Sequence, residues 1–553
     1  MSRKTIVIIG GALSGPTAAA RAREVDEQAR IVMVERNRRV SYAVCGLAYH
    51  LSGEVARLED LDQERAKFFE SVYNIEVWTD SEVTALDPAK QTVMVTRADR
   101  SEALAYDALI VALGAASRLP QNLPAGAQPG NLVCFRTIDD LETIQRQTRG
   151  GGKRITILGG GPMGMEAADG LVRHGADVTV IEKQSRLLGS FSSIFSDAAL
   201  HALRSKAKVF LSTDVSGFEM AGNRISSLKL SDGSRLETDL VISTIGLRPR
   251  TSLLQTAGSK LAPDQTVIID DHARTSLPNV YACGVCVSTP QAVTGRAVWY
   301  PQGALADKTA QVAGANAAGA DRKLSPALGS MLIRALDVTV GRTGLTRAEA
   351  STCFGQDEVA VTAVSAPTHE SYFPASAPLL LEMIWRRSDG RILGVEAAGV
   401  AGVDKRIDVA AGLIAGSIDI ERLAVLDFGF EPPYSAARDP LNVAATVASS
   451  ERSGLARSIE PDELIRCLRD VQVIDVRPNG VKGRASIQGA VRIPLEQLRG
   501  HMKSLDRKRS IVTVSESGRR GMQAARILAQ CGFGNVVNLA GGLQVWALRT
   551  EAR

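Results

Sequence analysis

Two stretches of the chain share one pattern of apolar runs and glycine turns. They are residues 5–37, TIVIIGGALSGPTAAARAREVDEQARIVMVERN, and residues 154–184, RITILGGGPMGMEAADGLVRHGADVTVIEKQ. Each begins with a short β-branched run, continues through glycines into an alanine-rich stretch, and closes with an apolar run and an acidic residue. Apolar runs of this length between glycine turns are typical of buried parallel strands. We therefore predict two β-α-β units and an α/β fold class.

Both units carry the glycine and carboxylate pattern of a dinucleotide-binding turn. The glycines let the backbone approach a pyrophosphate at the start of a helix, and the carboxylate accepts hydrogen bonds from a ribose. The residues are Gly159, Gly161, Gly164 and the acid Glu182 in the second unit, and Gly10, Ala12, Gly15 and the acid Glu35 in the first. Alanine at the middle position adds only one methyl group. Two copies predict two bound dinucleotides, and the alternative is that the glycines serve only a tight turn between strand and helix.

The pattern of hydrophobic and polar residues changes after residue 325. Alternating runs such as LDVTVGRTGL and PLLLEMIWRRSDGRILGVEAAG, with SDG as a hairpin turn, predict a separate α+β domain over residues 326–446. The polar residues 447–458 are the predicted linker. From 459 to 553, the short apolar runs VQVIDVR, AVRIPL, SIVTVSES and NVVNLAGG alternate with helical stretches. A small α/β domain is therefore expected at this end of the chain.

Composition narrows the class of protein. The chain has 553 residues, of which 45% are hydrophobic and 23% charged, and its formal net charge is +5 at pH 7. These values are ordinary for a globular protein of several domains, and no block of lysines and arginines indicates nucleic-acid binding, although a small anionic ligand is left open. No apolar run approaches the roughly 18 residues that a membrane helix needs. We expect no membrane partner and a cytoplasmic location.

Cysteine usage points to one reactive thiol. Seven cysteines, at positions 45, 134, 283, 286, 353, 467 and 531, are few for this length and odd in number. Neither a disulfide framework nor a metal site is predicted from them. Cys45 lies in SYAVCGLAY, between the two repeats and without a second cysteine near it. The alternative interpretation is that Cys45 is a small buried apolar residue.

Further motifs resemble a known family. LIVALGA (109–115), DLVISTIGLRPR (239–250) and TSLPNVYACG (275–284) resemble the connecting and second flavin motifs of the FAD-dependent pyridine nucleotide-disulfide oxidoreductases. SYAVCGLAYHLSG resembles the active-site segment of their single-cysteine branch, and HESYFPA, GVDKRIDVAAG and EPPYSAARDPLNVAA point within it to the coenzyme A-disulfide/persulfide reductases. The stretch from VIDVR to VNLAGG resembles a rhodanese domain.

The resemblance implies two Rossmann-like dinucleotide-binding domains, an α+β dimerisation domain and a C-terminal rhodanese-like domain. The implied boundaries are 1–150 and 241–325 for the two parts of the FAD-binding domain, 151–240 for the NAD(P)H-binding domain, 326–446 for the dimerisation domain, 447–458 for the linker and 459–553 for the rhodanese-like domain. FAD and NADH are the implied cofactors. Their implied binding residues are Gly10, Gly11, Ala12, Gly15, Glu35, Arg36, Ser41, Ala112, Gly114, Gly159, Gly161, Pro162, Met163, Gly164, Glu166, Glu182, Gly246, Gly284 and Val285.

Cys45 is the implied redox residue. In dithiol members of the family a C-x4-C pair forms an internal disulfide, but the position five before Cys45 is Val40. Cys45 must therefore exchange with an external partner, through a mixed disulfide, a persulfide or a sulfenate. Positive charge near the flavin and a following helix are expected to lower the pKa of this thiol. Cys283 and Cys286 fall inside the flavin motif and are expected to be packing residues, and Cys531 is expected in the core.

Glu182 indicates which of NADH and NADPH is the preferred cofactor. A carboxylate accepts from a ribose 2′-hydroxyl and repels a 2′-phosphate, so NADH is favoured, while the neighbouring Lys183 leaves NADPH open.

Several positions depart from the family pattern. Ser515 stands where the rhodanese loop has its cysteine, in SESGRRG, so we predict no sulfurtransferase activity there. Two roles remain for this domain. It binds an anion at the helix start near Gly518, with Arg519 or Arg520, or it is purely structural. Val285 replaces an aspartate next to the flavin ribityl chain, which costs about 1.5–3 kcal/mol of cofactor binding.

The thiol-substrate pocket also departs from the pattern. The implied substrate contacts are Arg21, Ser41, Cys45 and Phe430, and Tyr372 is a second catalytic candidate. Phe430 stands where the family has a tyrosine, and Val44 where it has an asparagine. Loss of a hydroxyl that protonates or binds a leaving thiolate puts coenzyme A in doubt as the physiological thiol, but not a sulfur-centred acceptor.

The expected function is that of a homodimeric flavoprotein that uses NADH to reduce a small disulfide, persulfide or polysulfide through Cys45. The first alternative is an NADH oxidase or peroxidase in which Cys45 cycles through a sulfenate. The second is a degenerate member whose tail is a binding module. Retention of both fingerprints and of Cys45 argues against the second alternative.

Overall fold

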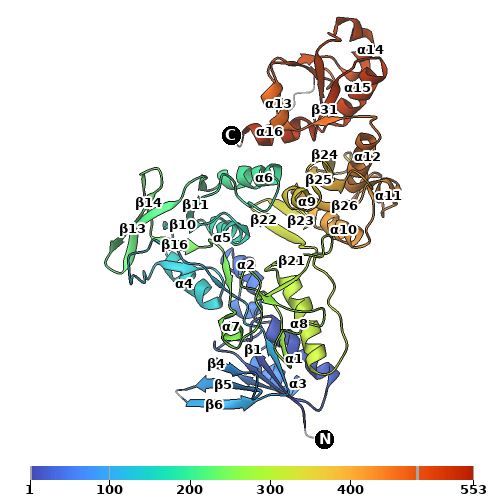
Figure 1. Ribbon diagram of the computed structural model, residues 1–553. Coiled ribbons are helices and arrows are strands. Elements are labelled where there is room, and N and C mark those ends of the chain that lie inside the picture. The colour runs from blue at the N-terminus through green and yellow to red at the C-terminus, as the bar shows by residue number, and fades with distance from the viewer. Residues whose placement is uncertain (1–2, 99, 481–484, 552–553) are drawn as a thin grey trace. The chain divides into compact units, whose positions relative to one another are not determined.

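The computed structural model describes residues 3–98, 100–480 and 485–551 (Figure 1). The chain divides into two compact units, one formed by Met1–Lys183 and Phe210–Ala327, the other by Gln184–Val209 and Leu328–Arg553. Helices of the described ranges are all too short or too polar to pass through a lipid bilayer. The predicted α/β class is confirmed by the parallel sheets described below.

The first unit is built on a five-stranded parallel sheet that contains the first repeat. Its order is β19-β7-β1-β2-β3, with the bounds β19 (Val280–Ala282), β7 (Ala108–Val111), β1 (Thr5–Ile9), β2 (Arg30–Val34) and β3 (Ile75–Trp78). Successive residues of β1 face opposite sides, so Ile6 and Ile8 enter one apolar cluster while Val7 and Ile9 enter another. Because both faces of the sheet are covered, its strands are apolar at nearly every position.

Two alanine-rich helices cover one face of this sheet. They are α1 (Ser14–Val25), which follows the first glycine turn, and α8 (Gly303–Ala317). A Cβ on Gly314 of α8 would lie 2.2 Å from the carbonyl oxygen of Ala18 in α1. Small side chains therefore allow the two backbones to approach closely, which explains the composition of the predicted helix.

The second repeat forms a second sheet in the order β12-β11-β10-β16-β9. The bounds are β12 (Lys208–Phe210), β11 (Asp177–Ile181), β10 (Arg154–Leu158), β16 (Leu240–Ser243) and β9 (Leu132–Cys134). Helix α5 (Pro162–Arg173) has proline at its first position, where the missing N–H costs nothing. Helix α4 (Ile138–Thr148) begins with a capping box between Thr137 and Asp140. Both predicted β-α-β units are thus confirmed.

Short elements complete the first unit. The small sheets are β4-β5-β6 (Ser81–Asp87, Thr92–Arg97, Arg100–Ala105), β13-β14-β15 (Val215–Ala221, Arg224–Leu230, Arg235–Glu237), β17-β8 (Leu247–Pro249, Ala115–Ser117) and β18-β20-β21 (Val267–Ile268, Val287–Pro290, Ala297–Val298). The helices are η1 (Val44–Gly46), α2 (Leu47–Leu51), η2 (Leu58–Leu61), α3 (Ala66–Tyr73) and α7 (Ser252–Thr256).

The second unit contains an antiparallel sheet in the order β22-β23-β26-β25-β24. The bounds are β22 (Met331–Ala335), β23 (Val338–Gly344), β26 (Ile392–Gly399), β25 (Pro378–Arg386) and β24 (Val359–Pro367). The predicted SDG hairpin joins β25 to β26, with Gly390 at φ +72°. The accompanying helices are α6 (Ser193–Arg204), α9 (Arg347–Phe354), α10 (Val403–Ala415), α11 (Ile420–Val425) and α12 (Pro440–Arg452).

The C-terminal part of the second unit is a parallel sheet in the order β27-β31-β30-β28-β29. Its strands are β27 (Ser458–Ile459), β31 (Val536–Leu539), β30 (Ser510–Val514), β28 (Val471–Asp475) and β29 (Val491–Arg492). Its helices are α13 (Pro461–Cys467), η3 (Leu495–Gln497), α14 (Leu498–His501), η4 (Met502–Ser504), α15 (Arg519–Gln530) and α16 (Gly542–Glu551).

Two local predictions differ from the structure. Helix α12 continues to Arg452, so the first half of the predicted linker is helical. Its N-terminal cap Asp439 and Pro440 favour a helix that runs through the polar serines. Cys531 was expected in the core but is exposed, because it follows the last residue of α15, where the helix ends at the surface.

Candidate active site

Cys45 lies in the first unit, on a short helical turn beside the first repeat. The turn η1 holds Cys45 at its centre and leads directly into α2. The preceding segment is fixed to the glycine turn, because the Ser41 N–H donates to the carbonyl of Gly11 at 2.7 Å. The thiol is exposed and forms no disulfide among the described residues. The sequence thus brings the single cysteine next to the first glycine turn.

The first glycine turn is a cradle that side chains would fill. A Cβ on Gly15 would lie 1.7 Å from the carbonyl oxygen of Gly10, and one on Gly10 would lie 2.4 Å from that of Ala112. Gly10 also has φ +107°, which favours glycine. Close packing of β1, β7 and α1 therefore requires glycine at both positions, and it leaves the amide groups at the start of α1 facing outward.

The second turn repeats this geometry. A Cβ on Gly164 would lie 1.9 Å from the carbonyl oxygen of Gly159, and Gly159 has φ +99°. A Cβ on Gly161 would meet no atom within 4 Å. Ala12 holds the corresponding place in the first repeat, so its methyl group has room there, as expected from the sequence.

The two carboxylates occupy equivalent places. Glu35 Oε2 accepts from the Gly11 N–H at 2.6 Å, and Glu182 Oε2 accepts from the Gly160 N–H at 2.7 Å. Each acid is held at the end of the second strand of its repeat, facing the glycine turn. This is the position from which a carboxylate accepts hydrogen bonds from a ribose. Both turns therefore fit a dinucleotide.

Some of the other predicted cofactor residues lie around the first glycine turn. Gly284 packs against Ser14 at the start of α1, since a Cβ there would lie 2.6 Å from Ser14 Oγ. A Cβ on Gly114 would lie 3.6 Å from Val285 Cγ2. Ala112 donates its N–H to Ile9 in β1 at 2.8 Å. Arg36 is exposed and Gly246 has φ +117°. Pro162 and Met163 begin α5, and Glu166 lies one turn further along this helix.

Sequence reasoning missed two residues beside Cys45 and the flavin motif. A Cβ on Gly303, the first residue of α8, would lie 3.7 Å from Cys45 Sγ. Arg136 Nε donates to the carbonyl of Ala115 at 2.9 Å, and its Nη2 would lie 4.0 Å from a Cβ on Gly114. The sequence signal for Arg136 was its place directly before the capping box of α4, which identifies a fixed helix start but not its neighbours.

The pKa of Cys45 is raised, whereas the sequence prediction had it lowered. Although the residue is exposed at the surface, desolvation by the protein atoms around Sγ raises the pKa of this thiol, the Glu166 carboxylate raises it further, and the Arg136 guanidinium opposes both. The prediction considered positive charge near the flavin and the following helix, whereas Glu166 lies far away in sequence. The surroundings that the chain itself provides therefore disfavour the thiolate form of Cys45.

Glu166 is a strongly perturbed carboxylate. Burial raises the pKa of Glu166 to about 7, and the nearby Asp169 contributes. Helix α5 packs on α2 at Gly170, where a Cβ would lie 2.9 Å from the carbonyl oxygen of Ala48. Glu166 lies about one turn before Gly170, and Cys45 lies just before α2. The two titrating groups are therefore neighbours across this helix contact.

We expect Glu166→Gln to move the titration of Cys45 to lower pH. Removal of the carboxylate charge removes one cause of the raised pKa, so the thiolate forms earlier as the pH increases. The measurement is the rate of Cys45 alkylation by iodoacetamide as a function of pH, since only the thiolate reacts. Glu59→Gln, which neutralises an exposed acid in η2, is the control and should leave the curve in place. If the alkylation curve of Glu166→Gln coincided with that of the wild type, Glu166 would not be a cause of the raised pKa of Cys45.

The predicted thiol-pocket residues are divided between the two compact units. Arg21, in α1, forms an ion pair with Glu24 at 2.5 Å. Tyr372 and Phe430 belong to the second unit, and their side chains are 74% and 50% exposed. Two aromatic rings so open to solvent are unusual for core residues, and they suit a surface that another chain covers.

The C-terminal loop carries a hydroxyl at its centre. Ser515 is 3% exposed, and its Oγ accepts from the Gly521 N–H at 3.1 Å. Gly518 has φ +81° and begins α15, while Arg519 and Arg520 are exposed. The loop therefore surrounds Ser515 with backbone groups but holds no sulfur.

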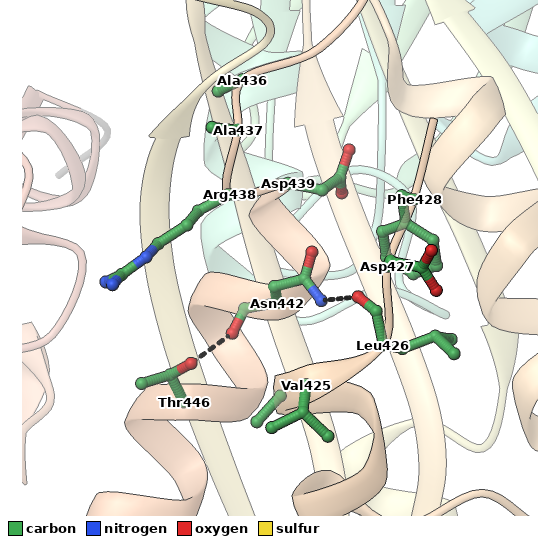
Figure 2. Close-up of a pocket in the computed structure, with 11 residues that line it drawn as sticks. Val425, Leu426, Asp427, Phe428, Ala436, Ala437, Arg438, Asp439, Asn442 and Thr446 are labelled. Carbon is green, nitrogen blue, oxygen red and sulfur yellow. Dashed lines mark hydrogen bonds between the residues drawn. The ribbon is translucent and has the colours of Figure 1, made fainter. Parts of the chain in front are cut away.

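A cavity of about 290 Å³ lies elsewhere in the second unit, between the end of α11 and α12 (Figure 2). Asn442 Nδ2 donates to the carbonyl of Leu426 at 2.9 Å, and Thr446 Oγ1 donates to the carbonyl of Asn442 at 2.8 Å. The first of these bonds holds the loop after α11 against α12, and the second lies within α12. No cysteine lines the cavity, so the redox chemistry is not assigned to it.

Comparison with known families covers most of the chain. The model described as "Pyridine nucleotide-disulphide oxidoreductase" matches residues 4–303, and the model of that family's dimerisation domain matches residues 334–441. The model described as "Rhodanese-like domain" matches residues 460–549.

Individual proteins are similar over nearly their whole length. An NADH oxidase of Methanocaldococcus jannaschii is 28% identical over 451 residues, which are 81% of this chain and 99% of that protein. The reduced CoADR-RHD of Bacillus anthracis has a TM-score of 0.93 at 27% identity, covering 100% of this chain and 99% of that one. An NAD-dependent persulfide reductase from A. fulgidus has a TM-score of 0.92 at 29% identity, covering 98% of this chain and 100% of that one.

Proposed function

Because the chain belongs to the pyridine nucleotide-disulphide oxidoreductase family, we propose that it uses NAD(P)H to reduce a small disulfide, persulfide or polysulfide through Cys45. The observation that carries this proposal is the position of one exposed thiol beside the glycine turn of the first repeat, without a cysteine partner among the described residues. The CoADR-RHD and the persulfide reductase that share its fold support a sulfur-centred acceptor.

The family's cofactors are FAD and NAD(P)H, and the two cradles fit them. The first cradle, with Gly10, Gly15 and Glu35, lies beside Cys45 and would hold FAD. The positive charges of Arg136 and Arg250 favour binding of the FAD diphosphate. Burial lowers the pKa of Arg250, and the neighbouring charges of Arg36 and Arg136 lower it further. Such a concentration of positive charge is relieved by an anion. FAD, when bound, supplies the transfer of an electron pair from NAD(P)H to sulfur.

The second cradle, with Gly159, Gly164 and Glu182, would hold NAD(P)H. Glu182 favours NADH, because a carboxylate repels a 2′-phosphate. Pro162 and Met163 lie in the first turn of α5, next to that cradle, and Glu166 lies one turn further along. Glu166, with its pKa of about 7, changes charge near neutral pH and so can accept or release a proton near Cys45.

Cys45 performs the sulfur chemistry. Its thiolate attacks one sulfur of the substrate R–S–S–R, the substrate S–S bond breaks, and one thiolate RS⁻ leaves. The product is a mixed disulfide between Cys45 and the second R–S group. Reduction by two electrons and one proton then releases R–SH and restores the Cys45 thiolate. The sum is NAD(P)H, one proton and one disulfide converted to NAD(P)⁺ and two thiols.

The remaining domains complete the proposal. We assign 1–150 and 241–325 to FAD, 151–240 to NAD(P)H, 326–446 to dimerisation and 459–553 to the rhodanese-like tail, with one change at the first two boundaries. Strand β9, which pairs with β16, and the end of β16 at Ser243 belong to the NAD(P)H-binding sheet. A homodimer is expected, since the second unit carries the family's dimerisation domain and exposes Tyr372 and Phe430. Covered by a second copy, these rings would approach that copy's substrate. Ser515 predicts that the tail transfers no sulfur.

An acceptor comparison tests the proposal. FAD-reconstituted protein should oxidise NADH rapidly with coenzyme A disulfide, coenzyme A persulfide, glutathione disulfide, tetrathionate or polysulfide under argon, and slowly when no sulfur acceptor is added. Fast, acceptor-independent oxidation under air would favour the rival function. That rival is an NADH oxidase with a Cys45 sulfenate, and the M. jannaschii relative named NADH oxidase supports it.

A further inference from the structure

Helix α6 links the nucleotide sheet to the second unit. It joins β11 to β12, two neighbouring strands of that sheet, yet its residues belong to the second compact unit. Glu182 follows β11, and its N–H donates to the carbonyl of Phe210 in β12 at 2.8 Å. The backbone of the ribose carboxylate is therefore held by the strand to which α6 leads. Helix α6 and this carboxylate are therefore connected through the backbone of β12.

The start of α6 is fixed by the antiparallel sheet. The Ser192 N–H donates to Glu396 Oε2 at 2.8 Å, and Arg342 Nη1 donates to the carbonyl of Ser190 at 2.7 Å. Glu396 and Arg342 are 1% and 4% exposed. A carboxylate at the start of a helix is stabilised by the helix dipole and by the unsatisfied N–H groups there.

The body of α6 is fixed by the last helix of the chain. Arg549 in α16 forms ion pairs with Asp197 of α6 at 2.9 Å and with Asp462 of α13 at 2.8 Å. Glu551 lies 3.3 Å from His201, one turn further along α6. Asp197 is 5% exposed, and burial raises its pKa while Arg549 opposes that shift. A carboxylate buried to this degree needs its guanidinium partner.

Helix α16 also holds the serine-bearing loop. The N–H groups of Leu543 and Gln544, in its first turn, donate to the carbonyls of Ser515 and Glu516 at 2.9 and 3.1 Å. The Gln544 side chain bonds to Ser365 of β24. One helix thus connects the degenerate loop, the antiparallel sheet and α6.

From these contacts we propose that the C-terminal domain acts as a brace for α6 and thereby supports NAD(P)H binding at Glu182. The proposal rests on the NAD(P)H site of the proposed function. It gives a role to a domain whose loop carries Ser515 in place of a reactive sulfur. The C-terminal domain then binds a helix of its own chain, through the ion pair of Arg549 with Asp197. The hydrogen bonds of α16 hold α16 itself in place within the domain.

The test is Arg549→Met in the full-length, FAD-loaded protein. Loss of the guanidinium leaves Asp197 buried without its partner, so α6 should exchange amide hydrogens faster and NADH should bind about fivefold more weakly or worse. FAD absorbance should be unchanged. Arg526→Met, at an exposed position of α15 in the same domain, is the matched control and should change neither exchange nor affinity.

A second variant separates this effect from misfolding of the C-terminal domain. Asp197→Asn leaves that domain intact and should also weaken NADH binding. In the double variant the unpaired buried charge is gone, so its loss of affinity should be smaller than the sum of the two single losses. Unchanged exchange of α6 in Arg549→Met, or faster exchange with unchanged NADH affinity, would overturn the proposal. Absence of NADH binding in the wild type would instead refute the proposed function.

Discussion

Replacing Cys45 by serine is expected to abolish reduction of any sulfur acceptor while leaving the flavin spectrum unchanged. A hydroxyl neither attacks a disulfide nor carries a mixed disulfide, so turnover should fall by at least about a thousandfold, as for other lost nucleophiles. The Cys45 side chain faces Gly303, where a Cβ would lie 3.7 Å from Sγ, and serine is smaller. FAD binding should therefore persist. The measurements are steady-state NADH oxidation with a disulfide and the visible absorbance of the flavin.

A second exposed cysteine provides the control for this experiment. Cys531 follows α15 in the C-terminal domain and is exposed, as Cys45 is. Cys531→Ser should leave turnover unchanged. Full activity in Cys45→Ser would show that electrons reach the acceptor without this thiol, and the assignment of Cys45 would then be wrong.

The repeats were predictable because their signal is local. Each strand, glycine turn and helix follows within about thirty residues, and the collisions that require Gly15 and Gly164 arise inside one β-α-β unit, with the carbonyl oxygens of Gly10 and Gly159. Residue types and their spacing therefore carry enough information. The acids Glu35 and Glu182 were found for the same reason, since each ends the second strand of its own repeat.

Contacts between distant segments were not predictable in the same way. Arg136 and Gly303 approach the first repeat from positions far along the chain, and nothing in their own surroundings indicates that approach. The pKa of Cys45 was predicted with the wrong sign because desolvation of the thiol raises it, and because Glu166, from the other repeat, raises it further. Charges brought together by tertiary structure decide such shifts, and a single sequence does not show them.

Alanine at Gly164 is expected to disable the NAD(P)H site while sparing the FAD site. The added Cβ would lie 1.9 Å from the carbonyl oxygen of Gly159 and 2.9 Å from Thr244 Oγ1, so α5 must move away from the turn. Forced overpacking costs about 1–3 kcal/mol of folding stability, so the Tm should fall. Because the displaced turn no longer fits the dinucleotide, we expect NADH binding to weaken by about 5- to 150-fold, the usual range of coupling between a local change and a binding site. The FAD content should stay unchanged, because the first repeat is a separate turn. The measurements are the Kd for NADH, the flavin absorbance and the Tm.

Gly161→Ala is the matched control, since it adds the same methyl group to the same turn. No atom lies within 4 Å of that Cβ, and Gly161 has an ordinary φ of −76°. The Tm should therefore stay at the wild-type value, and the loss of NADH affinity should be smaller than for Gly164→Ala, because Ala12 already holds the equivalent place in the first repeat. Equal losses in both variants at an unchanged Tm would show that contact with the nucleotide, rather than the approach of α5 to Gly159, sets the affinity of this site.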